Sequence, residues 1–365
     1  MKKVLIGLVS DDPTESISII TKSFIRGLKG RYDFIPLVAN RKVTTNKRSS
    51  VNLFNVYYYV KHLALWVYNI LRYSPEIAHY PITSFWNMEK SLTYLFIAHV
   101  FGIKTIGHLH GGAFVEFWST LSPVRKKTAL YIFGKLDALV VLSPAWKEKV
   151  CGITGINPEK VHVVSNPMDS DFEKVALDNS YNTENKDILC LGVMDTQKGV
   201  FDILEAARSL DEASGVKFIL AGPEREPGIY KRIDDYIKKF NLQEKVVVMP
   251  GVWGDDKIAL FKSASVLLLP SYIENFPVVV IEAAAFGMPL LTTRVGALPE
   301  YFVDKASIIY IEPASPRQLF DAVTFLHTND EQRLALGAEA RRVYLDKLST
   351  SKSFETLSFV YDSLN

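Results

Sequence analysis

Two glutamates eight residues apart form the most informative pattern in the chain. Glu274 and Glu282 flank Pro277 within PSYIENFPVVVIEAAAFGMPLLTTRVGALPE, residues 270–300. Proline suits the first turn of a helix, where the N–H that it lacks would have no partner anyway. Glu274 is therefore expected in the loop before a helix, and Glu282 about a turn and a half inside it. The free N–H groups of residues 275–280 and the helix dipole would bind an anion, and the carboxylates would accept hydrogen bonds from hydroxyl groups.

A lysine supplies the second pattern, in LGVMDTQKGVFDILEAA over residues 191–207. The apolar residues before Lys198-Gly199 predict a strand and those after it a helix, so Lys198 is expected in the connecting loop. A lysine in such a loop can neutralise a diphosphate as a point charge. A Lys-Gly pair alone is common and weak evidence for a phosphate site. It becomes informative because it occurs in the same chain as the Glu274–Glu282 pattern, at the expected place before it.

A histidine supplies the third pattern, in IGHLHGGAF over residues 106–114. His110 follows a predicted strand, and the two glycines after it let the backbone approach a ligand closely. An isolated histidine in such a place is usually packed and hydrogen-bonded. We expect His108 to point away from His110, on the alternation of side chains along a strand.

These three patterns together resemble the retaining glycosyltransferases of family 4, the E-x7-E group with the GT-B fold. That family has Glu-(Gly/Asn)-Phe-Pro, a helix that opens with Glu-Ala, a Gly-x-Pro turn, a Gly-(Gly/Ala)-x-x-Glu turn, a Lys-Gly loop and a His-Gly element. The matching residues here are Glu274-Asn275-Phe276-Pro277, Glu282-Ala283, Gly287-Met288-Pro289, Gly296-Ala297-Leu298-Pro299-Glu300, Lys198-Gly199 and His110-Gly111-Gly112.

The resemblance implies a role for each matching residue. Glu274 and His110 would lie near the transferred sugar, Lys198 would meet the diphosphate, and these three form the expected catalytic set. Glu282 would bind the ribose of the nucleotide. The expected donor-binding residues are Gly111, Gly112, Asn275, Phe276, Pro277, Val278, Glu282, Arg294 and Gly222. No metal ion and no cofactor are expected, since the nucleotide sugar is itself a substrate.

Two departures from the family pattern affect the expected phosphate site. Val193 stands where the family usually has an arginine. Lys198 would then carry more of the diphosphate charge, or Arg294 or Arg225 would compensate. The first strand is followed by Ser10-Asp11-Asp12 instead of a Gly-Gly loop. Because two acids would repel a diphosphate, we expect this loop to face the acceptor or to be displaced.

Strands alternate with helices along nearly the whole chain, which predicts an α/β protein of two Rossmann-like doubly wound domains facing a cleft. The resemblance implies that this is the GT-B fold. By the resemblance, residues 1–168 would form the acceptor-side domain and residues 169–347 the donor-binding domain, with a C-terminal helix over about 348–365 packing back on the first. The polar stretch 178–186 would link them. The expected strands are 4–10, 33–39, 76–80, 104–110, 138–143, 161–166, 187–193, 217–222, 246–251, 265–271, 289–293 and 307–311.

Composition and charge limit the partners. With 365 residues and 48% hydrophobic residues the chain can bury large cores, and its 2 cysteines form no disulfide framework, so a reduced, cytoplasmic location is expected. Residues 1–168 carry 21 Lys and Arg against 10 Asp and Glu, a net charge of +11, while the remainder is at −9. The basic half therefore suggests an anionic partner. No stretch is long and apolar enough for a membrane span, and no nucleic-acid motif is present.

The aromatic stretch 56–73 and the basic residues 41–48 and 125–127 are the clues to the acceptor. Tyrosines, a tryptophan and two cations on one helix suit a helix at a membrane surface, and they equally suit a core helix with a solvated face. The chain would be cytoplasmic, with peripheral contact at the inner face of the cell membrane.

The expected activity is transfer of a hexose-type sugar from a nucleotide diphosphate sugar to an acceptor hydroxyl, with retention, in the assembly of bacterial surface polysaccharide or glycolipid. The acceptor would be a sugar or a lipid-linked group. Two alternatives remain open: a non-catalytic scaffold subunit with the same fold, and a sugar phosphorylase or sugar-phosphate synthase.

Overall fold

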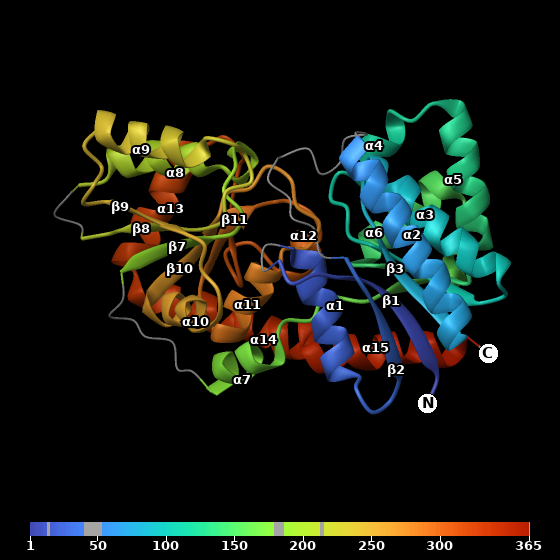
Figure 1. Cartoon of the computed structure of the whole chain (residues 1–365). Coiled ribbons are helices and arrows are strands. Elements are labelled where there is room, and N and C mark those ends of the chain that lie inside the picture. Colours follow the sequence, from blue (N-terminus) through green and yellow to red (C-terminus); the bar gives the residue numbers. More distant parts are fainter. Residues whose placement is uncertain (13–14, 40–52, 179–185, 212–214, 365) are drawn as a thin grey trace. The chain divides into compact units, whose positions relative to one another are not determined.

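The computed structural model describes residues 1–12, 15–39, 53–178, 186–211 and 215–364 (Figure 1). The chain divides into two compact units. Unit 1 comprises Met1–Asp169 with Thr350–Asn365, and unit 2 comprises Ser170–Ser349. The basic stretch 41–48 and most of the linker 178–186 lie outside the described residues.

Unit 1 is built on a six-stranded parallel sheet in the order β2-β1-β3-β4-β5-β6. Its strands are β1 (Lys3–Val9), β2 (Asp33–Val38), β3 (Ile77–Ile82), β4 (Lys104–Leu109), β5 (Ala138–Val141) and β6 (Val161–Val163). Its helices are α1 (Ser16–Gly27), α2 (Leu53–Tyr73), α3 (Trp86–Val100), α4 (Phe114–Ser119), α5 (Pro123–Lys135), α6 (Pro144–Thr154) and α15 (Thr350–Ser363). Strands β3 and β5 are buried along their full length, and apart from His79 they hold no charged or strongly polar side chain.

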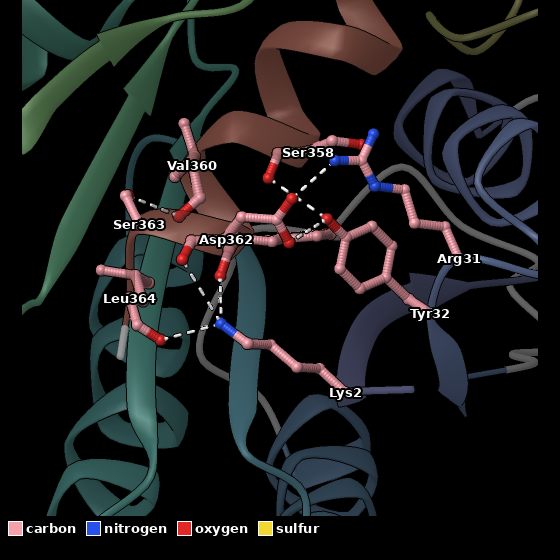
Figure 2. Close-up of polar contacts among 9 residues, drawn as sticks. Lys2, Arg31, Tyr32, Ser358, Val360, Asp362, Ser363 and Leu364 are labelled. Carbon is pink, nitrogen blue, oxygen red and sulfur yellow. Dashed lines mark hydrogen bonds and ion pairs between the residues drawn. The ribbon is translucent and has the colours of Figure 1, made fainter.

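The C-terminal helix α15 belongs to unit 1, although it ends the chain. Figure 2 shows the polar contacts that fasten its end. Lys2 Nζ donates to the Leu364 carbonyl at 3.2 Å, and Arg31 pairs with Asp362 at 2.6 Å. The Tyr32 hydroxyl donates to Asp362 Oδ1 at 2.7 Å. Residues from the two ends of the chain therefore share one compact unit.

Unit 2 repeats the architecture with a sheet in the order β12-β11-β10-β7-β8-β9. Its strands are β7 (Asp187–Leu191), β8 (Phe218–Gly222), β9 (Val246–Pro250), β10 (Ala264–Leu269), β11 (Leu290–Thr293) and β12 (Ile309–Ile311). Its helices are α7 (Ser170–Asp178), α8 (Val200–Ser209), α9 (Ile229–Lys239), α10 (Gly254–Ser263), α11 (Val278–Phe286), α12 (Leu298–Tyr301), α13 (Pro316–Thr328) and α14 (Asp330–Val343), after which a π-helical turn covers Tyr344–Leu348.

The apolar cores lie between these sheets and their helices. In unit 2, α8 and α13 pack on the sheet through Val200, Ile203, Leu319 and Val323, all fully buried. Such close packing of aliphatic side chains supplies most of the stabilising free energy of a doubly wound domain. The prediction of two Rossmann-like α/β domains is confirmed. Both sheets are parallel throughout, so the loops after their strands gather at one edge of each sheet.

Candidate functional site

In unit 2 the loop after β7 lies against the loop after β10. The Tyr272 amide donates to the Gln197 carbonyl at 2.8 Å. Gly199 adopts φ +70°, and a Cβ there would collide with the carbonyl oxygen of Pro270. Only glycine fits both the left-handed backbone and this close approach. The contact fixes where the side chain before Gly199 projects.

That side chain, Lys198, forms an ion pair with Glu274. Their side chains are only 15% and 14% exposed, so water screens the pair weakly. The loop of Lys198 is held by Asp195, whose carboxylate accepts from the Lys198 amide at 3.0 Å. The structure therefore brings together the two residues for which the sequence predicted a diphosphate contact and a sugar contact.

The turn after Glu274 rests on the Gly-Ala turn that follows β11. Gly296 has φ +58°, and a Cβ there would collide with the carbonyl oxygen of Asn275. The same carbonyl accepts from the Ala297 amide at 2.7 Å. The Asn275 side chain is 7% exposed, and neither its Oδ1 nor its Nδ2 has a partner among the described residues. An unpaired buried amide is costly, and a bound ligand would satisfy it.

Phe276 is buried by a different contact. Its ring stacks on Tyr301, with centroids 5.1 Å apart and planes 12° apart, and the residue is 3% exposed. The side chain therefore packs the turn, and a ligand could meet Phe276 through its backbone alone.

Helix α11 begins at Val278, with Pro277 as its N-cap, and ends at Gly287 with φ +71°. Both bounds follow the sequence prediction, since proline starts a helix well and glycine ends one. The amides of Val278 and Val279 have no partner within the helix. The Val280 amide, by contrast, donates to the Pro277 carbonyl at 3.1 Å. The expectation that all amides over 275–280 are free was therefore wrong for Val280, because the first turn closes on the N-cap.

Glu282 lies on the buried side of α11 and is 4% exposed. Lys257 of α10 holds it at 2.5 Å, and the Lys257 ammonium also lies 4.7 Å from the centroid of the Phe172 ring. A buried carboxylate needs such a partner, because an uncompensated buried charge would cost several kcal/mol. No signal in the sequence pointed to Lys257, since it belongs to no motif and lies on another helix.

The two arginines that could replace the missing family arginine are both engaged. Arg225 pairs with Asp195, and Arg294 pairs with Asp304 at 2.7 Å while its guanidinium covers the Tyr310 ring at 4.5 Å. Either arginine would have to exchange a carboxylate for a phosphate in order to bind one. Lys198 is the most shielded of these three cations. Its side chain is 15% exposed, whereas those of Arg225 and Arg294 are 53% and 51% exposed.

Gly222 ends β8 at a point where two backbones touch. Its φ is +143°, and a Cβ there would collide with the carbonyl oxygen of Gly192, at the end of β7. The Tyr230 hydroxyl donates to the Gly222 carbonyl. Gly222 therefore has a structural reason to be glycine, whether or not a nucleotide lies beside it.

In unit 1 the His110 element follows β4. The His110 amide donates to the Ile82 carbonyl at 2.9 Å, so the loops after β3 and β4 continue side by side. A Cβ on Gly111 would crowd Ser84, which explains the first glycine. His110 is half-buried, and burial lowers the pKa of its imidazole to about 4. The ring is therefore neutral at pH 7.

The rings of His108 and His110 lie 4.1 Å apart between centroids. The prediction that His108 points away from His110 was wrong. Adjacent residues alternate along a strand, but residues two positions apart share a face.

The loop Ser10-Asp11-Asp12 follows β1 in unit 1. Lys22 Nζ donates to the Ser10 carbonyl at 2.6 Å and lies 4.0 Å from Asp11. Within the described ranges of the chain, no group of three or more His, Cys, Asp or Glu is placed to hold a metal ion. Nor does any helix in those ranges have the length and hydropathy of a membrane span.

Comparison with known proteins places these features in a family. The model of glycosyl transferases group 1 matches residues 171–343, and that of Glycosyltransferase Family 4 matches residues 24–172. An uncharacterized glycosyltransferase of Methanocaldococcus jannaschii is 30% identical over 188 residues, which are 49% of this chain and 47% of that protein. A D-inositol 3-phosphate glycosyltransferase of Corynebacterium glutamicum is 22% identical over 60% of this chain and 56% of its own.

The chain thus spans about half the length of these curated relatives. Among solved structures, Anabaena HepE in complex with UDP-glucose matches over 100% of both chains with a TM-score of 0.76 and 14% identity, a likeness of fold. Together the two family models cover nearly all of both sheets. This chain has the GT-B fold and belongs to the family 4, group 1 glycosyltransferases.

Proposed function

We propose that this glycosyltransferase moves a hexose-type sugar from a nucleotide diphosphate sugar to an acceptor hydroxyl with retention of the anomeric configuration. The observation that carries the proposal is the shielded Lys198–Glu274 pair beside the N-terminus of α11. HepE, which shares the fold, was solved in complex with UDP-glucose, and UDP-sugars are therefore the first donors to test. The acceptor class we propose is a sugar or lipid-linked group in bacterial surface polysaccharide or glycolipid assembly.

The chemical work in such a transfer is stabilisation of the leaving group. Negative charge grows on the departing diphosphate, and a preorganised cation with helix amides lowers the barrier. Glu274 holds Lys198 in place through their ion pair. We propose that the diphosphate takes over Lys198, which releases the Glu274 carboxylate to accept hydrogen bonds from the sugar. One ion pair would thus provide two separate ligand contacts.

The remaining donor contacts follow from burial and charge. We propose that Glu282 accepts hydrogen bonds from ribose hydroxyls while Lys257 keeps its charge compensated. The unpaired Asn275 amide and the Val278 and Val279 N–H groups would meet the sugar or the phosphate. His110, neutral at pH 7, would hydrogen-bond the transferred sugar.

A donor panel tests the proposal. The purified chain is incubated with UDP-, GDP- and ADP-sugars, and release of free nucleotide and thermal stabilisation are measured. A bound donor raises the melting temperature, and slow hydrolysis shows that the donor is activated. Turnover only with inorganic phosphate would support a phosphorylase, and no binding of any nucleotide would support a scaffold subunit. Glu282→Gln should weaken binding of the preferred nucleotide by about tenfold, the worth of a charge-assisted hydrogen bond.

Contact with a membrane surface is the second part of the proposal, and helix α2 carries it. Tyr57, Val60, Tyr68 and Leu71 are 56–65% exposed and share one helical face by their spacing. Lys61 borders this face, and residues 53–73 contain no acid. Apolar and aromatic side chains with a cation suit an anionic lipid interface.

Vesicle sedimentation tests this contact. The chain should bind phosphatidylcholine vesicles that contain phosphatidylglycerol more strongly than vesicles without it, and Tyr68→Ser with Leu71→Ser should reduce that binding. Phe325→Ser, on the exposed side of α13, is the matched control because Phe325 is 43% exposed. Equal binding by all three proteins would exclude α2 as the contact.

A further inference from the structure

A row of buried aromatic rings crosses unit 1 from α15 to β4. The Tyr361 hydroxyl lies 2.6 Å from His79 Nδ1, and His79 Nε2 lies 3.2 Å from His108 Nδ1. All three residues are at most 3% exposed. The row ends at His108, whose ring lies against that of His110.

Both buried histidines of the row are uncharged at pH 7. Burial lowers the pKa of His79 to about 3, and burial with the neighbouring imidazoles lowers the pKa of His108 well below its usual range. Each ring therefore carries a single N–H, and the position of that proton decides what the ring can donate. Hydrogen-bond partners fix this choice.

Tyr361 determines the direction in which hydrogen bonds are donated along the row. Its buried hydroxyl needs an acceptor, and His79 Nδ1 is the acceptor within reach among the described residues. The proton of His79 then lies on Nε2 and is donated to His108 Nδ1. The proton of His108 must therefore lie on its own Nε2. The opposite direction would leave the Tyr361 hydroxyl buried without an acceptor, which is unfavourable.

His108 Nε2 is left as a buried donor. It has no hydrogen-bond partner anywhere in the described part of the chain. The His110 ring does not serve, because it lies 4.1 Å away between centroids, tilted by 32°, and forms no hydrogen bond with His108 Nε2. A buried donor of this kind is normally satisfied by a bound molecule.

We propose that His108 is a further sugar-binding residue, which donates its Nε2–H to the transferred sugar next to His110, and that Tyr361 is a positioning residue that fixes this tautomer through His79. The inference rests on the proposed function, since it is a sugar at His110 that His108 would meet. The C-terminal helix would thereby serve sugar recognition as well as the stability of unit 1.

Nuclear magnetic resonance tests the direction of the row without any activity measurement. In protein labelled with 15N at its histidines, long-range 1H–15N spectra distinguish a protonated Nδ1 from a protonated Nε2. Both His79 and His108 should be neutral Nε2–H tautomers at pH 7, and Tyr361→Phe should give His79 mixed tautomers. A protonated Nδ1 on His108 in the unmodified chain would overturn the inference.

Substitution of His108 tests its contact with the sugar. Asparagine reaches only as far as Nδ1, so His108→Asn keeps the link to His79 and loses the distal donor. Glutamine reaches as far as Nε2, so His108→Gln keeps that donor. In hydrolysis of the best donor of the panel, His108→Asn should raise KM about 3- to 10-fold, the worth of one hydrogen bond, and His108→Gln should raise it less than His108→Asn does.

Two tyrosines separate positioning from stability. Tyr361→Phe loses the hydroxyl that contacts His79, whereas Tyr32→Phe loses a hydroxyl that fastens the same helix through Asp362 (Figure 2). Both variants should lower the melting temperature, but only Tyr361→Phe should raise the donor KM, by at least about twofold. Equal KM values for the two variants, or for His108→Asn and the unmodified chain, would overturn the inference and point to a water at Nε2.

The unmodified chain and Lys198→Ala serve as references. If Lys198→Ala loses turnover while His108→Asn keeps the KM of the unmodified chain, the proposed function stands and the role of His108 fails. If the unmodified chain activates no donor, both fail.

Discussion

Charge is arranged in opposite ways at the ends of the two sheets. In unit 2 the motif cations face carboxylates, as in Lys198 with Glu274 and Arg294 with Asp304. In unit 1 the motif residues His108 and His110 are neutral, because burial lowers the pKa of both rings. One unit offers paired charges and the other offers uncharged donors and acceptors.

The difference shows that the net charge of a unit does not predict where in the protein a charged ligand group would bind. Residues 1–168 hold a net +11, yet their motif end is neutral, and the acidic half holds the shielded lysine. A diphosphate needs a fixed cation, whereas sugar hydroxyls are read well by neutral hydrogen-bonding groups. The paired charges of unit 2 suit the diphosphate of the proposed donor, and the neutral rings of unit 1 suit sugar hydroxyls.

Among the predicted effects, the largest should be the loss of activity when Lys198 of unit 2 is replaced. Lys198→Ala should lower kcat for donor activation by about 10²- to 10³-fold, or about 3–4 kcal/mol, as removal of one oxyanion donor does. Lys238→Ala is the control, since Lys238 forms an exposed pair with Asp234 at 2.6 Å and should change kcat little. Turnover of Lys198→Ala within about threefold of the unmodified chain would show that the diphosphate is met elsewhere.

The free energy of unfolding should fall in acid because of the buried, neutral histidines of unit 1. In the unfolded chain, His79 and His108 become protonated near pH 6.5. In the folded chain, burial lowers the pKa of His79 to about 3 and that of His108 well below its usual range. Stability is therefore fully present above pH 6.5 and falls below it, by up to about 1.4 kcal/mol per pH unit for each histidine.

Urea unfolding at pH 7.5, 6.5 and 5.5 measures this dependence. Tryptophan fluorescence reports mainly on unit 1, which holds four of the five tryptophans. Replacing both histidines by glutamine should flatten the curve. A free energy of unfolding that stays constant from pH 7.5 to 5.5 would contradict burial of neutral rings.

A smaller effect sharpens the geometry around Lys198. Gly199 and Gly228 have φ of +70° and +78°, so alanine at either position incurs a similar left-handed backbone penalty of about 1 kcal/mol. Only at Gly199 would the new Cβ collide, with the Pro270 carbonyl. Gly199→Ala should therefore destabilise by about 1 kcal/mol more than Gly228→Ala in thermal unfolding. Equal losses of stability in the two variants would mean that the loop after β7 does not touch the loop after β10 at Pro270.

Local signals explain how much could be predicted from the sequence. Pro277 and Gly287 determine the bounds of α11, and apolar runs such as 264–269 determine the strands, because each is a property of neighbouring residues. The same holds for Lys198 and Glu274, whose loops follow adjacent strands of one sheet.

Long-range pairing explains what could not be predicted. Lys257 reaches Glu282 from a separate helix, and Tyr361 reaches His79 from 282 residues away along the chain. No periodicity or motif encodes such contacts, which depend on how finished elements pack. His108 was misassigned for a simpler reason, since the rule of alternation applies to adjacent residues and not to residues two apart.

Calorimetric titration of UDP and of uridine tests the central claim most directly, because the two ligands differ by the diphosphate. In the unmodified chain UDP should bind much more tightly than uridine, and Lys198→Ala should weaken UDP at least about tenfold while leaving uridine unchanged. Glu274→Gln, which breaks the ion pair but keeps the cation, should bind UDP at least as tightly as the unmodified chain. If Lys198→Ala binds UDP and uridine as the unmodified chain does, Lys198 does not hold the diphosphate.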